Sequence, residues 1–285
     1  MTVVIFEQTA LGGTCLNVGC IPTKTLLYSA KQYHALQSAG KYGLMAENLS
    51  FDYRKMQQRK QKVVRKLVAG VRQKLQNPNC TLVSSAATLL SHDSTRVVIE
   101  ADGQTYEAER LLIATGSTNF VPPIPGLAGN PDVWDSTDAL SASELPASVV
   151  IIGGGVIGME FAGIFNAFGS KVTVVEFLKE CLPATDSDMA KRLRKSLEKR
   201  GVEFFMQSAV KRIEGTQVGA SATANVIFGR KGKEQVVEAD IVLMATGRKP
   251  NVEGLNLEAA GIAYDRHGIK VDPGTMQVKA DRRDI

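Results

Sequence analysis

Short apolar runs alternate along this chain with longer stretches in which apolar residues recur at helical spacing, the pattern of an α/β protein. In the first half, the apolar runs predict strands over residues 3–6, 81–83, 95–100, 105–107 and 111–114. Pro22 predicts the start of a helix that runs toward Tyr33, because proline suits the first helical turn. The second half predicts strands over 148–152, 171–176 and 202–206, helices over 156–168 and 188–200, and a closing apolar run over 236–245.

The predicted strands of the second half are nearly continuous apolar runs, as a parallel sheet buried on both faces requires. Residues 148–176 therefore form a predicted βαβ unit. Residues 119–131 are rich in proline and glycine and predict a linker between two domains. The length of 285 residues agrees with two domains.

Composition excludes several classes of protein. Hydrophobic residues make up 44% of the chain and charged residues 22%, which is typical of a globular protein. No apolar run approaches the roughly 20 residues of a membrane span, and the first residues lack the basic segment of a signal peptide. We therefore expect no membrane association. Four cysteines are too few for a disulfide-built secreted scaffold and favour a reducing compartment.

The net charge of +5 is concentrated in residues 52–77, where nine basic side chains accompany one acid. Val63, Val64, Leu67, Val71 and Leu75 recur through this segment at helical spacing. They predict a long amphipathic helix whose basic side faces solvent. Because no aromatic platform for bases accompanies the charge, we expect no nucleic-acid partner.

A glycine-rich turn joins the first strand of the βαβ unit to its helix. As a G-x-G-x-x-G pattern, it places Gly153 in a tight turn, Gly155 where the backbone approaches a pyrophosphate, and Gly158 where the helix packs on the strand. Glu176 ends the next strand. A carboxylate there accepts hydrogen bonds from a ribose 2′-hydroxyl and repels a 2′-phosphate. The turn therefore predicts a dinucleotide site that prefers NAD to NADP.

Cys15 and Cys20 lie five positions apart, just before the helix predicted from Pro22. On an ideal helix they would point about 140° apart, so a disulfide needs a distorted turn, which Asn17 and Gly19 allow. A thiolate on Cys20 is favoured beside a helix N-terminus. Spacing alone leaves open both a redox pair and two unrelated core cysteines. We expect no metal site, because no second pair of cysteines or histidines accompanies Cys15 and Cys20, and the three histidines are isolated from one another.

Residues 11–24, LGGTCLNVGCIPTK, resemble the redox-disulfide signature of the flavoprotein disulfide reductases. Together with VE at 175–176, ATG at 114–116 and ATGRKPN at 245–251, they extend the resemblance over essentially the whole chain, which within the family is most similar to the dihydrolipoamide dehydrogenases. The resemblance implies two Rossmann-like doubly wound α/β domains. The implied FAD-binding domain covers 1–119 and continues over 252–285, and the NAD-binding domain is inserted at 120–251.

The resemblance also implies a role for each matching residue. Cys15 is the implied interchange thiol, which reacts with the substrate, and Cys20 is the implied thiol under the flavin. Lys24 is expected near the flavin N5, paired with Glu160. The implied FAD contacts are Glu7, Thr14, Lys24, Ala87, Thr115, Gly116 and Ser117, and the implied NAD contacts are Gly153, Gly155, Gly158, Glu176, Val210 and Gly247. Ser85 stands where we expect a glycine in the FAD-side turn.

The function that the resemblance implies is oxidation of dihydrolipoamide on the lipoyl domain of a 2-oxo acid dehydrogenase complex. Electrons are expected to pass to the two cysteines, then to FAD and to NAD, in a homodimer located in the bacterial cytoplasm or, as the alternative, the mitochondrial matrix. Two other functions stay open, a mercuric reductase-like enzyme and a non-catalytic NAD-binding module. Leu16 and Glu176 favour the lipoamide enzyme.

The resemblance further implies that the chain is shorter than family members at both ends. In the family, an FAD-binding glycine turn precedes the strand that ends at Glu7, and residues 278–285 resemble the approach to a second FAD motif. The family's C-terminal interface domain supplies a histidine and a glutamate to the partner subunit, and no histidine of this chain matches that pair. We therefore expect this chain alone to turn over dihydrolipoamide at a rate nowhere near that of a complete family member.

Overall fold

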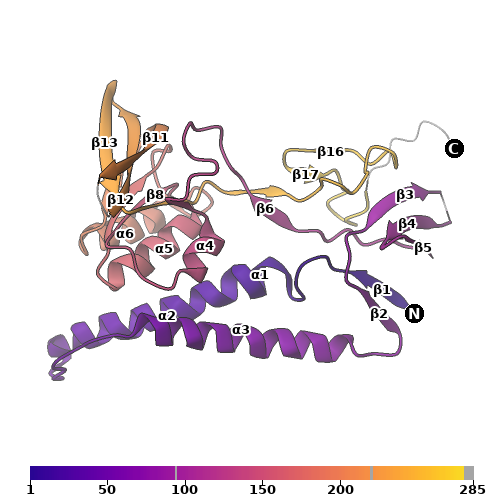
Figure 1. The fold of residues 1–285 in the computed structure, drawn as a ribbon, viewed down its shortest axis with the longest axis horizontal. Coiled ribbons are helices and arrows are strands. Elements are labelled where there is room, and N and C mark those ends of the chain that lie inside the picture. The colour runs from indigo at the N-terminus through magenta and orange to yellow at the C-terminus, as the bar shows by residue number, and fades with distance from the viewer. Residues whose placement is uncertain (94, 219–220, 279–285) are drawn as a thin grey trace. The chain divides into compact units, whose positions relative to one another are not determined.

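A computed structural model of the chain describes residues 1–93, 95–218 and 221–278. The chain divides into two compact units (Figure 1). Unit 1 comprises Met1–Asn17, Lys66–Thr118 and Arg248–Ile285, and unit 2 comprises Val18–Arg65 and Asn119–Gly247. Unit 2 is thus inserted into unit 1 in the sequence. Residues 279–285, on which most of the predicted approach to a second FAD motif rests, lie outside the described part.

Unit 1 is built from small sheets. β1 (Val3–Phe6) pairs in parallel with β2 (Cys80–Val83). β3 (Thr88–His92), β4 (Val97–Ala101) and β5 (Gln104–Ala108) form an antiparallel sheet, and β16 (Tyr264–Asp265) pairs with β17 (Gly268–Ile269). The unit also holds most of α1 (Gly13–Val18). Its buried core consists of Leu89, Ile99, Leu257, Ala260 and Ile262.

A five-stranded sheet forms the centre of unit 2. Its order is β10-β9-β8-β14-β7, and every neighbouring pair is parallel. The strands are β7 (Val133–Trp134), β8 (Ser148–Ile152), β9 (Lys171–Val175), β10 (Glu203–Phe205) and β14 (Ile241–Met244). The predicted βαβ unit is present, because α5 (Val156–Ala167) joins β8 to β9.

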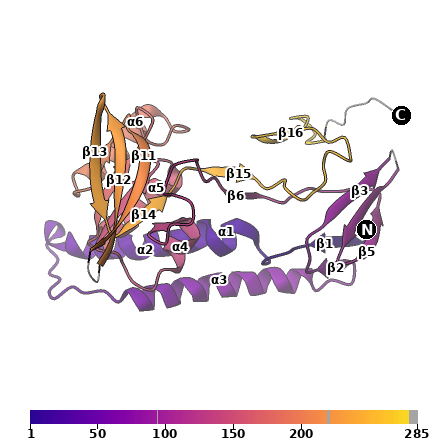
Figure 2. The ribbon, with the colours of Figure 1, turned by 45° about the horizontal axis from the view of Figure 1, so that its top comes forward.

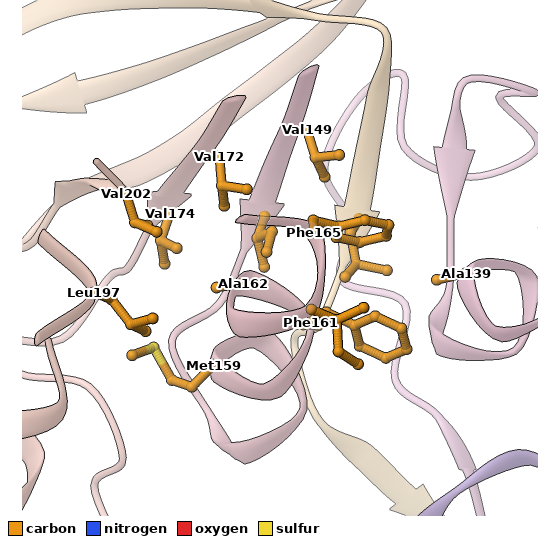
Figure 3. Close-up of a cluster of buried hydrophobic side chains, with 14 of the residues drawn as sticks. Ala139, Val149, Met159, Phe161, Ala162, Phe165, Val172, Val174, Leu197 and Val202 are labelled. Atoms are coloured by element: carbon orange, nitrogen blue, oxygen red, sulfur yellow. The ribbon is translucent and has the colours of Figure 1, made fainter. Parts of the chain in front are cut away.

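Alternate residues of β8 pack on opposite faces of this sheet, as the twofold period of a strand requires. Val149 and Ile151 belong to a core with Phe161 and Phe165 of α5 (Figure 3). Val150 belongs to a second core, which also contains side chains of an antiparallel sheet (Figure 2 shows this sheet). That sheet comprises β11 (Ala209–Val218), β12 (Ser221–Arg230) and β13 (Lys233–Ala239).

The remaining helices are α2 (Cys20–Gln37), η1 (Ala39–Tyr42), α3 (Tyr53–Leu75), α4 (Ser136–Ser141) and α6 (Ser187–Glu198). Of these, α2, α3, α4 and α6 each contribute side chains to the first core or to its edge. Leu26 of α2 packs in the same cluster as Phe161 of α5, and Gly163 of α5 faces Leu27 of α2, where a Cβ would lie at an ordinary contact distance of 3.9 Å. No helix in the described ranges is long and apolar enough to cross a membrane.

The predicted strand at 111–114 is absent. These residues pair with no strand in the described part of the chain, and Leu112 is 88% exposed. The apolar run alone predicted a strand, but a strand also needs a neighbour to accept and donate its backbone hydrogen bonds.

Residues 119–131 are not a free linker, which corrects the sequence-based prediction. Leu127 is 2% exposed in the core of unit 2, and the Ile213 N–H donates to the Pro125 carbonyl at 2.9 Å. Gly126 has φ +76°, and a Cβ there would lie 1.9 Å from the Ile213 carbonyl oxygen. The glycine therefore permits close packing on β11 rather than flexibility.

The apolar run at 236–245 is divided between two sheets. It forms the end of β13 and all of β14, with Asp240 at the turn between them. The Asp240 carboxylate accepts the Ser148 N–H at 2.8 Å, and the Asp240 N–H donates to the Ser148 hydroxyl at 2.9 Å. This exchange fixes the turn at the amino end of β8.

Candidate active site

In the turn between β8 and α5, two glycines lie so close to backbone carbonyl groups that a side chain would not fit. Gly153 has φ +107°, and a Cβ there would lie 2.4 Å from the Ala245 carbonyl oxygen. A Cβ on Gly158 would lie 2.1 Å from the Gly153 carbonyl oxygen. At Gly155, the N-cap of α5, a Cβ would meet nothing within 4 Å. Two glycines thus permit close packing, while the third borders open space.

The N-terminus of α5 has the properties of an anion site. Gly155 makes no side-chain cap, and the first turn of the helix contains no acidic residue. The first N–H groups of a helix have no acceptor within it, and the helix dipole adds partial positive charge there. Val156, at the start of the helix, is 59% exposed. A phosphate group is therefore a suitable ligand for this end of α5.

Glu176 follows β9 directly, and its carboxylate is held by the backbone of the glycine turn. The side chain accepts hydrogen bonds from the Gly154 N–H and, at 2.6 Å, from the Leu178 N–H, and the residue is 7% exposed. The structure therefore brings the predicted ribose acid beside the predicted pyrophosphate turn.

Gly154 is a site residue to which the sequence analysis gave no role. A Cβ there would lie 2.9 Å from the Cys181 sulfur and 3.1 Å from Glu176 Oε2. Any larger residue would displace the carboxylate or the loop that carries Cys181. The signal was present in the sequence as three consecutive glycines, but the G-x-G-x-x-G pattern leaves its middle position open.

Cys181 lies against this turn but is not suited to act as a nucleophile. Burial, together with the negative charges of Glu180 and Glu176, raises the pKa of its thiol to about 12. The residue is 1% exposed. A thiol so strongly held in the protonated form serves packing rather than chemistry.

Val210 and Gly247 belong to unit 2, like the glycine turn. Val210 lies on β11 at a shift in strand register, and its side chain packs against the second core. Gly247 has φ +105°, and its carbonyl accepts the Phe120 N–H at 3.0 Å. Their contact with NAD stays a prediction.

The two cysteines of the candidate redox motif lie on successive helices. α1 ends at Val18, and α2 begins at Cys20, with Gly19 between them at φ −137° and ψ −115°. Gly19 thus interrupts the helical backbone between the two cysteines, and a Cys15–Cys20 disulfide stays a prediction. Both cysteines are exposed. Cys20 lies at the N-terminus of an 18-residue helix that lacks a side-chain cap, a position that favours negative charge.

Lys24 of α2 forms an ion pair with Glu160 of α5. Each residue lies one helical turn from the beginning of its helix, Lys24 after Cys20 and Glu160 after Val156. The ion pair therefore places the N-terminus of the cysteine-bearing helix beside the N-terminus of the glycine-turn helix. The Lys24 side chain is 62% exposed and that of Glu160 20%.

The remaining predicted site residues belong to unit 1. Glu7 follows β1 directly, and its carboxylate accepts the Thr9 N–H and hydroxyl, both at 2.9 Å. Thr14 lies in α1, and Ala87 packs against the core of the unit.

The segment 115–117 is tied to the segment 248–251. The Thr115 hydroxyl donates to the Asn251 carbonyl at 2.6 Å, and the Gly116 carbonyl accepts the Asn251 N–H at 3.0 Å. The Ser117 hydroxyl accepts from Arg248 Nε at 2.8 Å. Strands β6 (Ser117–Asn119) and β15 (Arg248–Pro250) pair here, which fixes the predicted FAD contacts in one short sheet.

Across the described residues, no group of three or more histidine, cysteine, aspartate or glutamate side chains is arranged to hold a metal ion.

Comparisons with known proteins agree with this geometry. Residues 1–282 match the protein family described as pyridine nucleotide-disulphide oxidoreductase. The dihydrolipoyl dehydrogenase of Bacillus subtilis (strain 168) is 41% identical over 278 residues, which cover 96% of this chain and 59% of that protein. The mitochondrial dihydrolipoyl dehydrogenase of Pisum sativum is 36% identical over 94% of this chain and 53% of its own length.

A solved structure shows the same fold. The HOCl-induced flavoprotein disulfide reductase RclA of Escherichia coli, solved as a Cu(II) complex, matches 99% of this chain with a TM-score of 0.81 and 33% identity. The match covers 59% of that structure. This chain therefore spans somewhat more than half the length of these proteins.

Proposed function

The chain belongs to the pyridine nucleotide-disulphide oxidoreductase family, and we propose that it carries the redox and nucleotide sites of an enzyme that oxidises dihydrolipoamide and reduces NAD. The substrate class is drawn from dihydrolipoyl dehydrogenases that are 36–41% identical over about 95% of this chain. The proposed physiological dithiol is the lipoyl group of a 2-oxo acid dehydrogenase complex, encountered by a homodimer in the cytoplasm.

The Lys24–Glu160 ion pair is the observation that carries this proposal. It joins the helix that begins at Cys20 to the helix that begins after the glycine turn, within one unit. A thiol and a nucleotide that must exchange electrons need to lie close together. The ion pair keeps the two helix ends together and leaves the lysine more than half exposed, so its charge is available to a group bound there.

The residues present fit NAD at the turn between β8 and α5. Gly155 leaves the space that a pyrophosphate would fill, and the uncapped end of α5 supplies N–H donors. Glu176 would accept the 2′-hydroxyl of the adenosine ribose.

The residues also fit FAD at the end of β1, because that strand end repeats the geometry of β9. Glu7 donates its N–H to Val83 and accepts the Thr9 N–H, just as Glu176 donates to Phe205 and accepts the Leu178 N–H. Glu7 would therefore hold a ribose by the same means. FAD, when bound, supplies a ring that takes an electron pair from the dithiol and passes it to NAD as a hydride.

The chain's own residues would carry out the thiol exchange. A dihydrolipoamide thiolate would attack the Cys15 sulfur of a Cys15–Cys20 disulfide and displace Cys20 as a thiolate. The second substrate thiol would then attack the substrate sulfur of the mixed disulfide, which closes the lipoamide disulfide and releases Cys15. Dihydrolipoamide thereby loses two electrons and two protons, and the protein disulfide becomes two thiols. The helix N-terminus stabilises a thiolate on Cys20 as it is released. Lys24 offers a positive charge near this thiol, and the ion pair with Glu160 fixes the orientation of the Lys24 side chain.

A single-turnover experiment tests the proposal without depending on steady-state rate. The full chain is incubated with FAD, then mixed with one equivalent of dihydrolipoamide, and finally with NAD. We expect the visible flavin absorbance to fall on addition of the dithiol and NADH to appear on addition of NAD.

Cysteine variants provide the controls. Cys15→Ser should abolish the response to dihydrolipoamide, whereas Cys80→Ser, at the start of β2, should leave it intact. An unchanged response in Cys15→Ser, or no flavin response in the wild-type chain, would exclude the proposed chemistry.

A second candidate function is reduction of another electron acceptor or disulfide. The likeness to RclA of Escherichia coli, a flavoprotein disulfide reductase solved as a Cu(II) complex, favours this alternative. It predicts that NADH reduces the flavin and that Cu(II), rather than lipoamide, reoxidises it. The visible flavin absorbance distinguishes the two functions when lipoamide and Cu(II) are added separately to the NADH-reduced chain.

A further inference from the structure

The geometry points to the ion pair between Arg194 and Glu180 as the clamp that holds loop 177–182 in the shape that binds the adenosine ribose. Arg194 and Glu180 are then positioning residues for nucleotide affinity and for the choice of NAD over NADP. The inference rests on the proposed NAD site and assigns it residues outside the glycine turn.

The ion pair is bidentate and half-buried. Arg194 Nε lies 2.8 Å from Glu180 Oε1, and Nη2 lies 3.0 Å from Glu180 Oε2. The side chains are 20% and 18% exposed. Hydrogen bonding from Arg194 lowers the pKa of the Glu180 carboxyl. Paired, planar contacts of this kind are stronger and more directional than ordinary surface ion pairs.

The clamp is connected to the glycine turn through the next two residues of the loop. The Cys181 N–H donates to Glu180 Oε1 at 3.1 Å, and the Leu182 N–H donates to the Gly154 carbonyl at 2.9 Å. Gly154 in turn donates its N–H to the Glu176 carboxylate. A short series of contacts therefore runs from α6 to the acid that would hold the ribose.

The rest of the loop lacks apolar packing that could fix it independently. Phe177 is 72% exposed and Leu178 is 42% exposed. Polar contacts hold this part, because the Leu178 N–H donates to Glu176 at 2.6 Å and its carbonyl accepts the Gln207 N–H at 3.0 Å. Cys181 and Leu182 are held by the first core, so removing the clamp would loosen the loop between Leu178 and Glu180.

Glu198 supplies a matched control for the charge of Glu180. It also forms an ion pair with Arg194, at 2.6 Å, but it lies one turn away on α6 itself and has no hydrogen bond to loop 177–182 among the described contacts. Its side chain is 38% exposed. Glu198→Gln therefore removes a negative charge that pairs with Arg194 and leaves the contact between Arg194 and the loop in place.

The test is calorimetric titration of the full chain with NAD and, separately, with NADP. We expect Glu180→Gln and Arg194→Gln to weaken NAD binding about ten-fold, on the scale of one charge-assisted hydrogen bond. Binding of NADP should change less, because Glu176 already opposes its 2′-phosphate. The ratio of the two dissociation constants should therefore narrow. Glu198→Gln should keep the wild-type ratio.

Further variants separate positioning from simple loss of stability. Arg194→Lys keeps a positive charge on α6 but loses the bidentate contact, so we expect an intermediate NAD affinity. Glu180→Arg combined with Arg194→Glu restores the pair in reverse and should recover part of the NAD preference. Thermal unfolding of each variant identifies those that fold. If the glutamine variants do not fold, the NAD affinity of Arg194→Lys decides whether the clamp has a positioning role.

Two outcomes overturn the inference in distinguishable ways. If the wild-type chain prefers NAD and folded variants keep the same NAD-to-NADP ratio, the clamp has no positioning role while the NAD site stands. If the wild-type chain binds neither nucleotide, the proposed NAD site fails and the inference fails with it.

Discussion

Glu176 and Lys60, the two charged residues that are buried in the described part of unit 2, are held by backbone groups rather than by opposite charges. The Glu176 carboxylate accepts two N–H groups of neighbouring residues. The Lys60 ammonium, on a residue that is 6% exposed, donates to the carbonyl of Leu140 at the end of α4. Gln57, one turn before Lys60, leaves its buried Oε1 without a hydrogen-bond partner in the structure. Because a buried charge without a counter-ion is costly, each of these two charges should have a measurable effect. We expect Glu176 to affect the choice between NAD and NADP, and Lys60 to affect how the stability of the fold depends on pH.

Replacement of Glu176 by glutamine is expected to narrow the preference for NAD over NADP by about 1–3 kcal/mol, the scale of a hydrogen bond to a charged group. The amide removes the negative charge that would repel a 2′-phosphate. Calorimetry with both nucleotides measures the change, and Glu203→Gln, on the exposed start of β10, serves as the control. Equal binding of NAD and NADP by the wild-type chain would contradict the assignment of this acid.

Lys60 is expected to make the fold more stable as pH rises in the alkaline range. Burial lowers the pKa of the Lys60 ammonium from its ordinary value of 10.5, so the unfolded chain binds the proton more tightly than the fold does. The free energy of unfolding should therefore rise between the lowered pKa and 10.5, then level off.

Urea unfolding at several alkaline pH values measures this rise. The rise due to this group should disappear in Lys60→Met and persist in Lys62→Met, whose lysine is exposed on the same helix. A slope that is unchanged in Lys60→Met would show that other groups cause it.

At the scale of single elements, α5 contains two glycines with opposite structural requirements. Gly158 packs against the carbonyl of Gly153, whereas Gly163 faces Leu27 of α2 at an ordinary contact distance. The first glycine is fixed by the turn, and the second only by helix packing.

Gly158→Ala is expected to destabilise the chain by about 1–3 kcal/mol, because the added methyl group overlaps the Gly153 carbonyl. Gly163→Ala should be neutral or stabilising by up to about 1 kcal/mol, since alanine is the better helix former and space is available. Urea unfolding of the two variants gives the comparison. A larger loss from Gly163→Ala than from Gly158→Ala would contradict the packing described here.

The sequence predicts β8, α5 and β9 to within one residue at each end, because continuous apolar strands, a glycine turn and a helical apolar pattern all agree there. It does not reveal β11 and β12. Their alternation is interrupted by polar and small residues, and the register shift between Val210 and Arg212 breaks the twofold period. Each of these strands pairs with its neighbour in sequence, β11 with β12 and β12 with β13, so the interrupted alternation, and not distance along the chain, hides them.

The candidate site is predicted where the chemistry is local and missed where it depends on packing. Gly153, Gly158 and Glu176 follow from their spacing, and the structure gives them the expected surroundings. The fixed position of Gly154 and the contact between Arg194 and Glu180 do not follow from spacing. They arise because a loop after β9 folds back onto the turn after β8, which no local pattern encodes.

At the scale of the whole chain, the two units differ in the size of their cores. Unit 2 has two large clusters of buried side chains on either side of its sheet, whereas unit 1 has one cluster with five buried members. Buried apolar surface is the main source of stability, so unit 2 should be the harder unit to open.

Hydrogen exchange followed by mass spectrometry is expected to show this difference. Amides of β8 and β14 should exchange most slowly, and NAD should slow them further while leaving β4 of unit 1 nearly unaffected. Protection of β4 equal to that of β8 would contradict the assignment of stability to unit 2.

The contact between residues 120 and 247 has a consequence for recombination between homologous genes. A backbone hydrogen bond of 3.0 Å joins Phe120 to Gly247, so the long segment between them leaves and returns at almost the same point. Because the ends of this segment already touch, a homologous segment could replace it without stretching the flanking strands, provided that it keeps the surface that packs on Leu26 of α2. Exchange between ancestral genes at these two positions would transfer the proposed nucleotide site in one event while leaving the cysteine motif in place.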